Sequence, residues 1–227
     1  MKLKFGSIAS TTLLLALFLG TGCHSVNPVH AFQPPEPVAP DIALDRLKEG
    51  NKRFVAGTSQ NPRQSAAQRM ALAKGQWPFA AILGCADSRT SPDLVFDQGL
   101  GDLFIVRVAG NVVNHEGLGS IEYAVEHLGS RLIVVLGHEA CGAVKAARAE
   151  ASSGHLSPHL ASLLQAIKPA VTATAGEDLE STVRANVQHV TKLIRTNPEL
   201  KKLFAAGTIK VVGAYYDLDT GVVSYLP

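Results

Sequence analysis

The chain has 227 residues, 46% of them hydrophobic, which is enough for the core of one large domain or two small ones. Charged residues make up 18% and the formal net charge is only +2, so the composition gives no reason to expect nucleic acid or a strongly acidic partner. Aromatic residues, 6% of the chain, are scattered and are not interleaved with basic ones. We therefore predict a globular protein that does not bind nucleic acid.

Residues 1–22 are typical of a signal peptide. Two lysines near the start precede an apolar run at 12–19 that is too short to span a bilayer. The small residues before Cys23 resemble a bacterial lipobox, in which the cysteine is lipidated and becomes the first residue of the mature protein. Ordinary cleavage after the small-x-small sequence at 29–31 is the alternative. Both interpretations predict export to the periplasm or cell envelope, with a lipid anchor if Cys23 is modified.

The segment 23–40 is rich in proline and has no apolar periodicity, which is typical of an extended linker or arm. We expect the folded domain to occupy 41–227. Asp41 can cap a helix over 41–56, and a second helix fits 65–74. These two helices would form an N-terminal helical arm.

From residue 79 onward, short apolar runs alternate with helical patterns. Continuous apolar runs of this length predict strands buried on both faces, and they lie at 79–84, 103–108, 132–137 and 209–216, before a last strand at 222–226. Helical patterns lie at 117–128, 142–151, 160–167 and 179–196. This alternation predicts an α/β fold with a mostly parallel central sheet of about five strands, the last one antiparallel, flanked by helices.

Two of the predicted strands end beside residues that bind metals. Cys85 directly follows the first strand, and His138 and Cys141 follow the third. Because chemistry gathers at the carboxyl ends of parallel strands, we expect these side chains to meet. Two thiolates and one imidazole suit Zn²⁺, and three protein ligands leave a position open, as in catalytic sites. A Cys85–Cys141 disulfide, or a cysteine nucleophile assisted by His138, are the rival interpretations.

Asp87 and Arg89 follow Cys85 within four residues and predict a gate for such a site. Asp87 could bind the zinc as a fourth ligand and close it. Alternatively, Arg89 could pair with Asp87 and hold it away from the metal, which leaves room for water. Zinc would then lower the pKa of that water toward neutrality. The pair therefore predicts a catalytic rather than a structural metal.

The residues around these candidate ligands resemble the motif of the β-class carbonic anhydrases. The sequence Cys85-Ala86-Asp87-Ser88-Arg89 is followed, 53 residues after Cys85, by His138-x-x-Cys141, and similar motifs run from about 43 to 226. The resemblance implies Cys85, His138 and Cys141 as ligands of one Zn²⁺ per chain and the Asp87–Arg89 dyad as the catalytic gate. It also implies carbon dioxide and bicarbonate as substrates and assembly into dimers or tetramers.

The resemblance further implies substrate-binding residues of the plant-like subgroup. A glutamine nine residues before the first cysteine helps to bind substrate there, and Gln76 stands at that position. Phe104 and Tyr123 match residues that line its apolar pocket, and Gly142, beside the ligand Cys141, joins these candidates. The bicarbonate-inhibited subgroup has a tryptophan where this chain has Ile82, so we do not expect an allosteric bicarbonate site.

Three functions remain open at this stage. The first is hydration of carbon dioxide. The second is hydrolysis of a related small molecule, carbonyl sulfide or carbon disulfide, at the same zinc. The third is a non-enzymatic envelope protein with a structural zinc or a disulfide. The Asp87–Arg89 pair argues against the third, because a structural zinc needs no gate.

Overall fold

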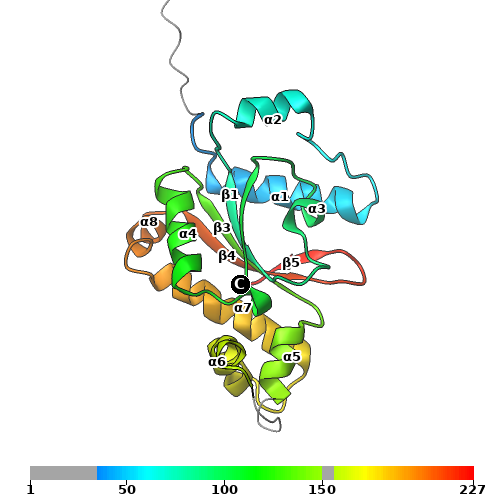
Figure 1. Ribbon diagram of the computed structural model, residues 1–227, viewed down its shortest axis with the longest axis vertical. Helices are drawn as coiled ribbons and strands as arrows, with labels where there is room; N and C mark the ends of the chain where they lie inside the picture. The colour runs from blue at the N-terminus through cyan, green and yellow to red at the C-terminus, as the bar shows by residue number, and fades with distance from the viewer. Residues whose placement is uncertain (1–34, 150–155) are drawn as a thin grey trace, which may run out of the picture. The chain divides into compact units, whose positions relative to one another are not determined.

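The computed structural model describes residues 35–149 and 156–227 (Figure 1). The predicted signal peptide, the lipidation candidate Cys23 and the first part of the predicted arm lie outside these residues. Within the described part, no helix is both long and apolar enough to cross a membrane.

A five-stranded sheet forms the centre of the fold, in the order β2-β1-β3-β4-β5. The first four strands are parallel, and β5 pairs antiparallel with β4. The strands are β1 (Ala80–Gly84), β2 (Leu103–Arg107), β3 (Leu132–His138), β4 (Lys210–Tyr216) and β5 (Val223–Tyr225). The α/β prediction is confirmed, and each predicted strand is found to within one residue at either end.

Helices surround this sheet. They are α1 (Pro40–Val55), α2 (Ala66–Leu72), α3 (Pro92–Val95), α4 (His115–Glu126), α5 (Gly142–Ala149), α6 (Pro158–Ala173), α7 (Leu179–Thr196) and α8 (Lys201–Ala205), with a short 3₁₀ helix, η1 (Ala109–Asn111). The sequence did not predict α3, η1 or α8, because elements of three to five residues are too short to show a helical period. The end of the helix predicted at 142–151 extends past the described residues.

The prediction that Asp41 caps the first helix is wrong. Helix α1 begins one residue earlier, at Pro40, and its N-cap is Ala39, which makes no side-chain cap. Proline is favoured at this first helical position because its missing N–H would have no partner there anyway. Asp41 therefore lies in the first turn, where a negative charge still suits the helix dipole, and it forms an ion pair with Lys210.

Helix α6 is about twice as long as predicted. Its start is set by Ser157, whose hydroxyl accepts a hydrogen bond from the N–H of Leu160. The helix then continues through Pro169, and Ile167 and Ala170 stay buried on one side of it. The apolar contacts of this last turn outweigh the one backbone hydrogen bond that Pro169 cannot donate.

The helices cover both faces of the sheet. On one face, Leu47 of α1 and Phe96 after α3 pack against β1, β3 and β4. On the other, Ile121 of α4 and Val187 and Val190 of α7 pack against the alternate residues of the strands. Helix α1 thus belongs to the core of its own chain, whereas α2 buries none of its residues.

A third cluster of buried residues lies at the carboxyl ends of the strands. Helices α5 and α6 pack beside α7 at this end, the lower end of the sheet in Figure 1. The cluster includes Val144 of α5, Leu164 and Ile167 of α6, and both Cys85 and Cys141. This packing buries the two cysteines that the sequence predicts as metal ligands.

Candidate metal centre

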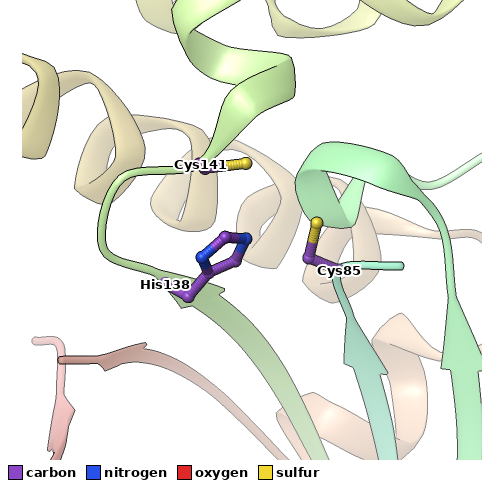
Figure 2. Close-up of side chains that lie close together, drawn as sticks. All are labelled: Cys85, His138 and Cys141. Carbon is purple, nitrogen blue, oxygen red and sulfur yellow. The ribbon is translucent and has the colours of Figure 1, made fainter. Parts of the chain in front are cut away.

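Three side chains converge at the carboxyl edge of the sheet. Cys85 follows β1, His138 ends β3, and Cys141 lies just before α5. Figure 2 shows the two sulfurs and the imidazole ring pointing toward one another, and their ligand atoms all lie within 4.8 Å of each other. The three residues are 4%, 1% and 1% exposed, respectively. Both cysteines are free thiols, so the predicted disulfide alternative does not describe this structure.

The orientation of His138 is set by its neighbour. Its Nδ1 lies 2.7 Å from the carbonyl oxygen of Glu139, to which an Nδ1–H donates. This hydrogen bond leaves Nε2 with its lone pair facing the cysteines. Nε2 is buried and has no hydrogen-bond partner among the described residues. A buried nitrogen without a partner is costly, and a metal ion is the partner that a neutral imidazole accepts there.

The turn that joins His138 to Cys141 is held to the end of β4, the strand beside β3. Ala140 has a left-handed backbone, with a φ of 51°. Glu139 donates its N–H to the carbonyl of Tyr216 at 2.9 Å, and its carboxylate accepts the N–H of Leu218 at 2.9 Å. These contacts anchor the turn to β4 and the loop after it, which keeps the two candidate ligands at a constant separation.

Backbone N–H groups surround the sulfur of Cys85. Gly110 donates to Sγ at 3.2 Å and Asp87 at 3.4 Å. The pKa of this thiol is lowered far below its ordinary value, first by a hydrogen bond with Cys141 and then by His138 and the two N–H groups, which together outweigh the effect of burial. The thiolate form, which is the one that binds metal, is therefore favoured at Cys85.

Cys141 occupies the N-cap position of α5. Its carbonyl accepts the N–H of Lys145 at 3.0 Å, and its sulfur accepts hydrogen bonds from the N–H groups of Val144 and Ala143. The pKa of Cys141 is nevertheless raised, first by its hydrogen bond to Cys85 and then by burial. The two sulfurs thus compete for one proton, and a divalent cation between them would favour both as thiolates.

Asp87 and Arg89 form a bidentate ion pair beside this cluster. Arg89 donates from Nε and from a terminal nitrogen at 2.9 and 2.7 Å, and its backbone N–H donates at 3.0 Å. These bonds hold the pKa of the Asp87 carboxyl well below its usual range. One oxygen of Asp87 lies 3.8 Å from Nε2 of His138, so the carboxylate borders the cluster while Arg89 holds it.

A second arginine clamps the loop that carries Cys85 and Asp87. Arg107, the last residue of β2, donates to the carbonyl of Cys85 at 2.9 Å and to that of Asp87 at 2.6 Å. Thr90 donates to the Asp87 carbonyl as well, at 3.0 Å. The sequence did not predict this role for Arg107, because it depends on the pairing of β1 with β2.

Helix α7 also reaches this loop. Asn186 is fully buried and donates from Nδ2 to the carbonyl of Gly110 at 2.8 Å. The sequence analysis did not select this residue. A signal was present, however, since Asn186 falls on the apolar stripe of the predicted helix at 179–196, beside Val183 and Val187.

The residues predicted to bind substrate are not part of the Cys–His–Cys cluster. Gly142 is the first residue of α5, exposed and directly after Cys141. Gln76 lies nine residues before Cys85, at the amino edge of the sheet, and the five residues of β1 that separate the two edges span ~16 Å. It lines a surface hollow of about 610 Å³ together with residues of α2. Within the described chain, Gln76 therefore does not join the cluster.

Phe104 and Tyr123 form an aromatic pair on the face that α4 covers. Their ring centroids are 6.3 Å apart, and Tyr123 is 47% exposed. Phe104 is the second residue of β2, and Tyr123 lies in the last turn of α4. No hydrogen bond or ion pair among the described residues links this pair to the Cys–His–Cys cluster.

The fold and the cluster together define a class: α/β proteins that hold two cysteines and a histidine at the carboxyl edge of a mostly parallel sheet. Residues 80–223 match the family described as carbonic anhydrase. Carbonic anhydrase 2 of Mycobacterium tuberculosis is 44% identical over 187 residues, which covers 80% of this chain and 90% of that protein. The carbonic anhydrase of Mycolicibacterium smegmatis is 40% identical over 189 residues, covering 81% and 92%.

Solved structures are similar as well. A tetrameric β-carbonic anhydrase from Sordaria macrospora has a TM-score of 0.64 and 27% identity, covering 82% of this chain and 97% of that one. The Coccomyxa β-carbonic anhydrase in complex with acetazolamide has a TM-score of 0.62 and 26% identity, covering 81% and 86%. The chain therefore belongs to the carbonic anhydrase family, in its β class, and the resemblance stated from its motifs is confirmed.

Proposed function

We propose that this protein catalyses the reversible hydration of carbon dioxide to bicarbonate and a proton, with one zinc ion held by Cys85, His138 and Cys141. The observation that carries the proposal is the convergence of three buried ligand atoms within 4.8 Å, one of them a histidine nitrogen that no described residue hydrogen-bonds. Membership of the carbonic anhydrase family supports the reaction. Sulfur and imidazole nitrogen are the donors that zinc takes in proteins, and three of them leave one position open.

A zinc ion held by these three residues would supply Lewis acidity, which lowers the pKa of water toward neutrality. The chain's own contribution is to place and orient the reactants. Asp87 keeps one carboxylate oxygen beside the cluster, 3.8 Å from Nε2 of His138, where it can accept a hydrogen bond from the attacking water. Arg89 holds both oxygens of that carboxylate, which prevents Asp87 from becoming a fourth ligand.

The Asp87–Arg89 pair therefore acts as the gate of the site. In the arrangement seen here the pair is intact, which corresponds to the open state. If Arg89 released the carboxylate, Asp87 could move toward the metal and close it. Arg89 also donates to the carbonyl of Ala140 at 3.5 Å, which connects the gate to the turn that carries the other two ligands.

Metal content and stopped-flow hydration, measured on one sample, test this proposal. We expect about one zinc per chain and catalysis of carbon dioxide hydration. Asp87→Asn should keep the zinc and lose roughly 10²-fold or more in turnover, since the new amide accepts hydrogen bonds less strongly and no longer pairs with Arg89. Fully active protein without metal would contradict the zinc site. Faster turnover of carbonyl sulfide or carbon disulfide would replace the proposed substrate.

We also propose that the active form is a self-associated dimer or tetramer. Strand β2 lies at an edge of the sheet, and its apolar residues are only partly buried. Gln76 lies too far from Cys85 to reach it in one chain, so a role in substrate binding requires the neighbouring subunit's copy. The tetrameric Sordaria macrospora relative supports assembly. Light scattering should give a mass of two or four chains, and a monomer with full activity would contradict both points.

Export completes the proposal. It is supported by the lysines and the short apolar run before Cys23, which are typical of a bacterial signal sequence. Mass spectrometry of the mature protein from bacterial membranes should find a lipid on Cys23, and Cys23→Ser should release the protein into the soluble fraction. An N-terminus at residue 32 would instead establish ordinary cleavage.

A further inference from the structure

The backbone of Gly110 is held on both sides. Its N–H donates to Sγ of Cys85 at 3.2 Å, and its carbonyl accepts Nδ2 of Asn186 at 2.8 Å. The next residue, Asn111, donates its N–H to the carbonyl of Val108 at 2.8 Å. Gly110 itself has a φ of 71°, in the left-handed region that glycine enters freely. Without contacts at both ends, the two peptide planes around such a residue could rotate.

Asn186 is positioned to restrain this rotation. It lies on α7 between Val183 and Val187, which press against Gly137: a Cβ built there would lie 2.4 Å from Val187 and 3.2 Å from Val183. Helix α7 therefore packs directly on the backbone just before His138. From this fixed surface the Asn186 side chain reaches a loop 76 residues away in the sequence.

We propose that Asn186 is a positioning residue of the metal centre: by holding the carbonyl of Gly110 it fixes the backbone of this glycine, so that the N–H on the other side of its Cα stays bonded to the sulfur of Cys85. The inference rests on the proposed zinc site. It adds that the electron donation of one ligand is controlled by a buried amide that touches neither metal nor substrate. Because the same turn of α7 holds the Gly110 backbone and packs on Gly137, directly before His138, that turn supports the position of two ligands at once.

The physical effect follows from the N–H···S bond. A donor on a thiolate draws electron density from the sulfur, so the sulfur donates less to a metal. If the Asn186 contact is removed, Gly110 can turn and its N–H can leave Cys85. The sulfur then becomes a stronger electron donor, and the loop that carries it becomes less ordered. Loss of a group that hydrogen-bonds to a metal ligand, without touching the metal itself, typically lowers metal affinity by about 10- to 100-fold.

A buried asparagine could also act only by stabilising the fold, and the chain offers a matched control. Asn51 of α1 is 7% exposed and donates to the carbonyls of Val95 and Gly221, while its own carbonyl accepts the N–H of Val223. In the part of the chain that the structure describes, Asn51 makes more side-chain hydrogen bonds than Asn186 and none to the loops of the metal centre. Asn51→Leu should therefore lower the stability without changing the metal centre.

The experiment compares the full-length wild type, Asn186→Leu and Asn51→Leu after loading with Co²⁺, whose absorption includes a thiolate-to-metal charge-transfer band. In Asn186→Leu we expect this band to move to longer wavelength, and release of zinc to a chelator to become about 10-fold faster or more. In Asn51→Leu both should match the wild type. Asn186→Ser, whose side chain is too short to reach Gly110, should reproduce the result if Asn186→Leu does not fold.

The outcomes separate this inference from the proposed function. If the wild type binds Co²⁺ without a thiolate band, the proposed metal site itself is wrong. If the wild type shows the band and the Asn186 variants keep both its position and the zinc release rate, the metal site stands and the role of Asn186 is wrong. Equal changes in the Asn186 and Asn51 variants would also overturn it, because a general loss of stability would then explain them.

Discussion

The two sulfurs of the metal centre reach the same point by different means. Cys141 is held by local structure: it is the N-cap of α5, and its sulfur accepts from the backbone N–H groups of Ala143 and Val144. Cys85 is held by distant structure: an N–H 25 residues away donates to its sulfur, and Arg107, 22 residues away, fixes its carbonyl. One ligand thus depends on a helix end and the other on the packing of the whole sheet edge.

The contrast indicates which part of the site tolerates substitution. A helix end forms from its own few residues, so Cys141 keeps its environment as long as α5 exists. The environment of Cys85 needs β1, β2, η1 and α7 to be in place together. We therefore expect substitutions around Cys85 to affect the metal more strongly than substitutions around Cys141, and the four predictions below test this from the largest effect to the smallest.

The first prediction is that Cys85→Ser and Cys141→Ser each lose zinc and catalysis, because a neutral hydroxyl is a poor ligand. The metal-free variants should differ in stability. Serine is a favoured N-cap, so Cys141→Ser should retain the start of α5, whereas Cys85→Ser has no such compensation. Zinc analysis and urea unfolding of the metal-free proteins check both statements. Full zinc retention in either variant would remove that cysteine from the ligand set.

The same difference explains how much the sequence could predict. The parallel strands were found from their continuous apolar runs, which in β1 and β3 are buried along the whole strand, and the meeting of Cys85, His138 and Cys141 followed from the carboxyl-edge rule. These features depend on local pattern and on one general rule of parallel sheets. The helix ends were less accurate, as Asp41 shows, since neighbouring residues compete for one cap.

The supports of Cys85 could not be predicted in the same way. The bonds of Arg107 and Asn186 span 22 and 76 residues, and they exist only once β1, β2 and α7 pack together. The position of Gln76 is different, because the strand predicted at 79–84 already separates it from Cys85 and from the carboxyl edge. A polar residue on an apolar stripe marks Asn186 as unusual, but its partner becomes clear only in three dimensions.

The second prediction concerns Gly110→Ala. A methyl group there would lie 2.8 Å from Ile167 and 3.2 Å from Ala143, on a residue with a φ of 71°. Both the clash and the left-handed backbone oppose it, and we expect a loss of about 2–3 kcal/mol in the free energy of unfolding. Because Gly110 also donates to Cys85, zinc release should become faster. Urea unfolding and chelator competition measure the two effects, and unchanged zinc release would argue against the N–H···S contact.

The third prediction concerns the clamp on the Cys85 loop. Arg107→Met keeps most of the aliphatic stem and removes two hydrogen bonds to backbone carbonyls, which should cost roughly 1–2 kcal/mol because the guanidinium is partly exposed. Zinc affinity should fall with it. Arg69→Met is the control, since Arg69 is exposed and donates to the carbonyl of Gln64 far from the site. Equal zinc affinity in the two variants would show that the clamp does not support the metal.

The fourth prediction is the smallest and lies on the Cys141 side. Gly142 begins α5, is not among the residues with positive φ, and a methyl group there would meet no atom within 4 Å. Gly142→Ala should therefore raise the free energy of unfolding by about 0.4–1 kcal/mol, because alanine has less freedom to lose on folding. Zinc affinity should not change, in contrast to Gly110→Ala.

Hydration kinetics of the Gly142→Ala variant test the substrate-binding prediction for Gly142. A higher KM with full zinc content would place this residue on the path of the substrate, whereas an unchanged KM would remove it from the binding site. A destabilised Gly142→Ala with weakened zinc binding would show instead that the Cys141 side is as sensitive as the Cys85 side, and the contrast between the two sulfurs would be wrong.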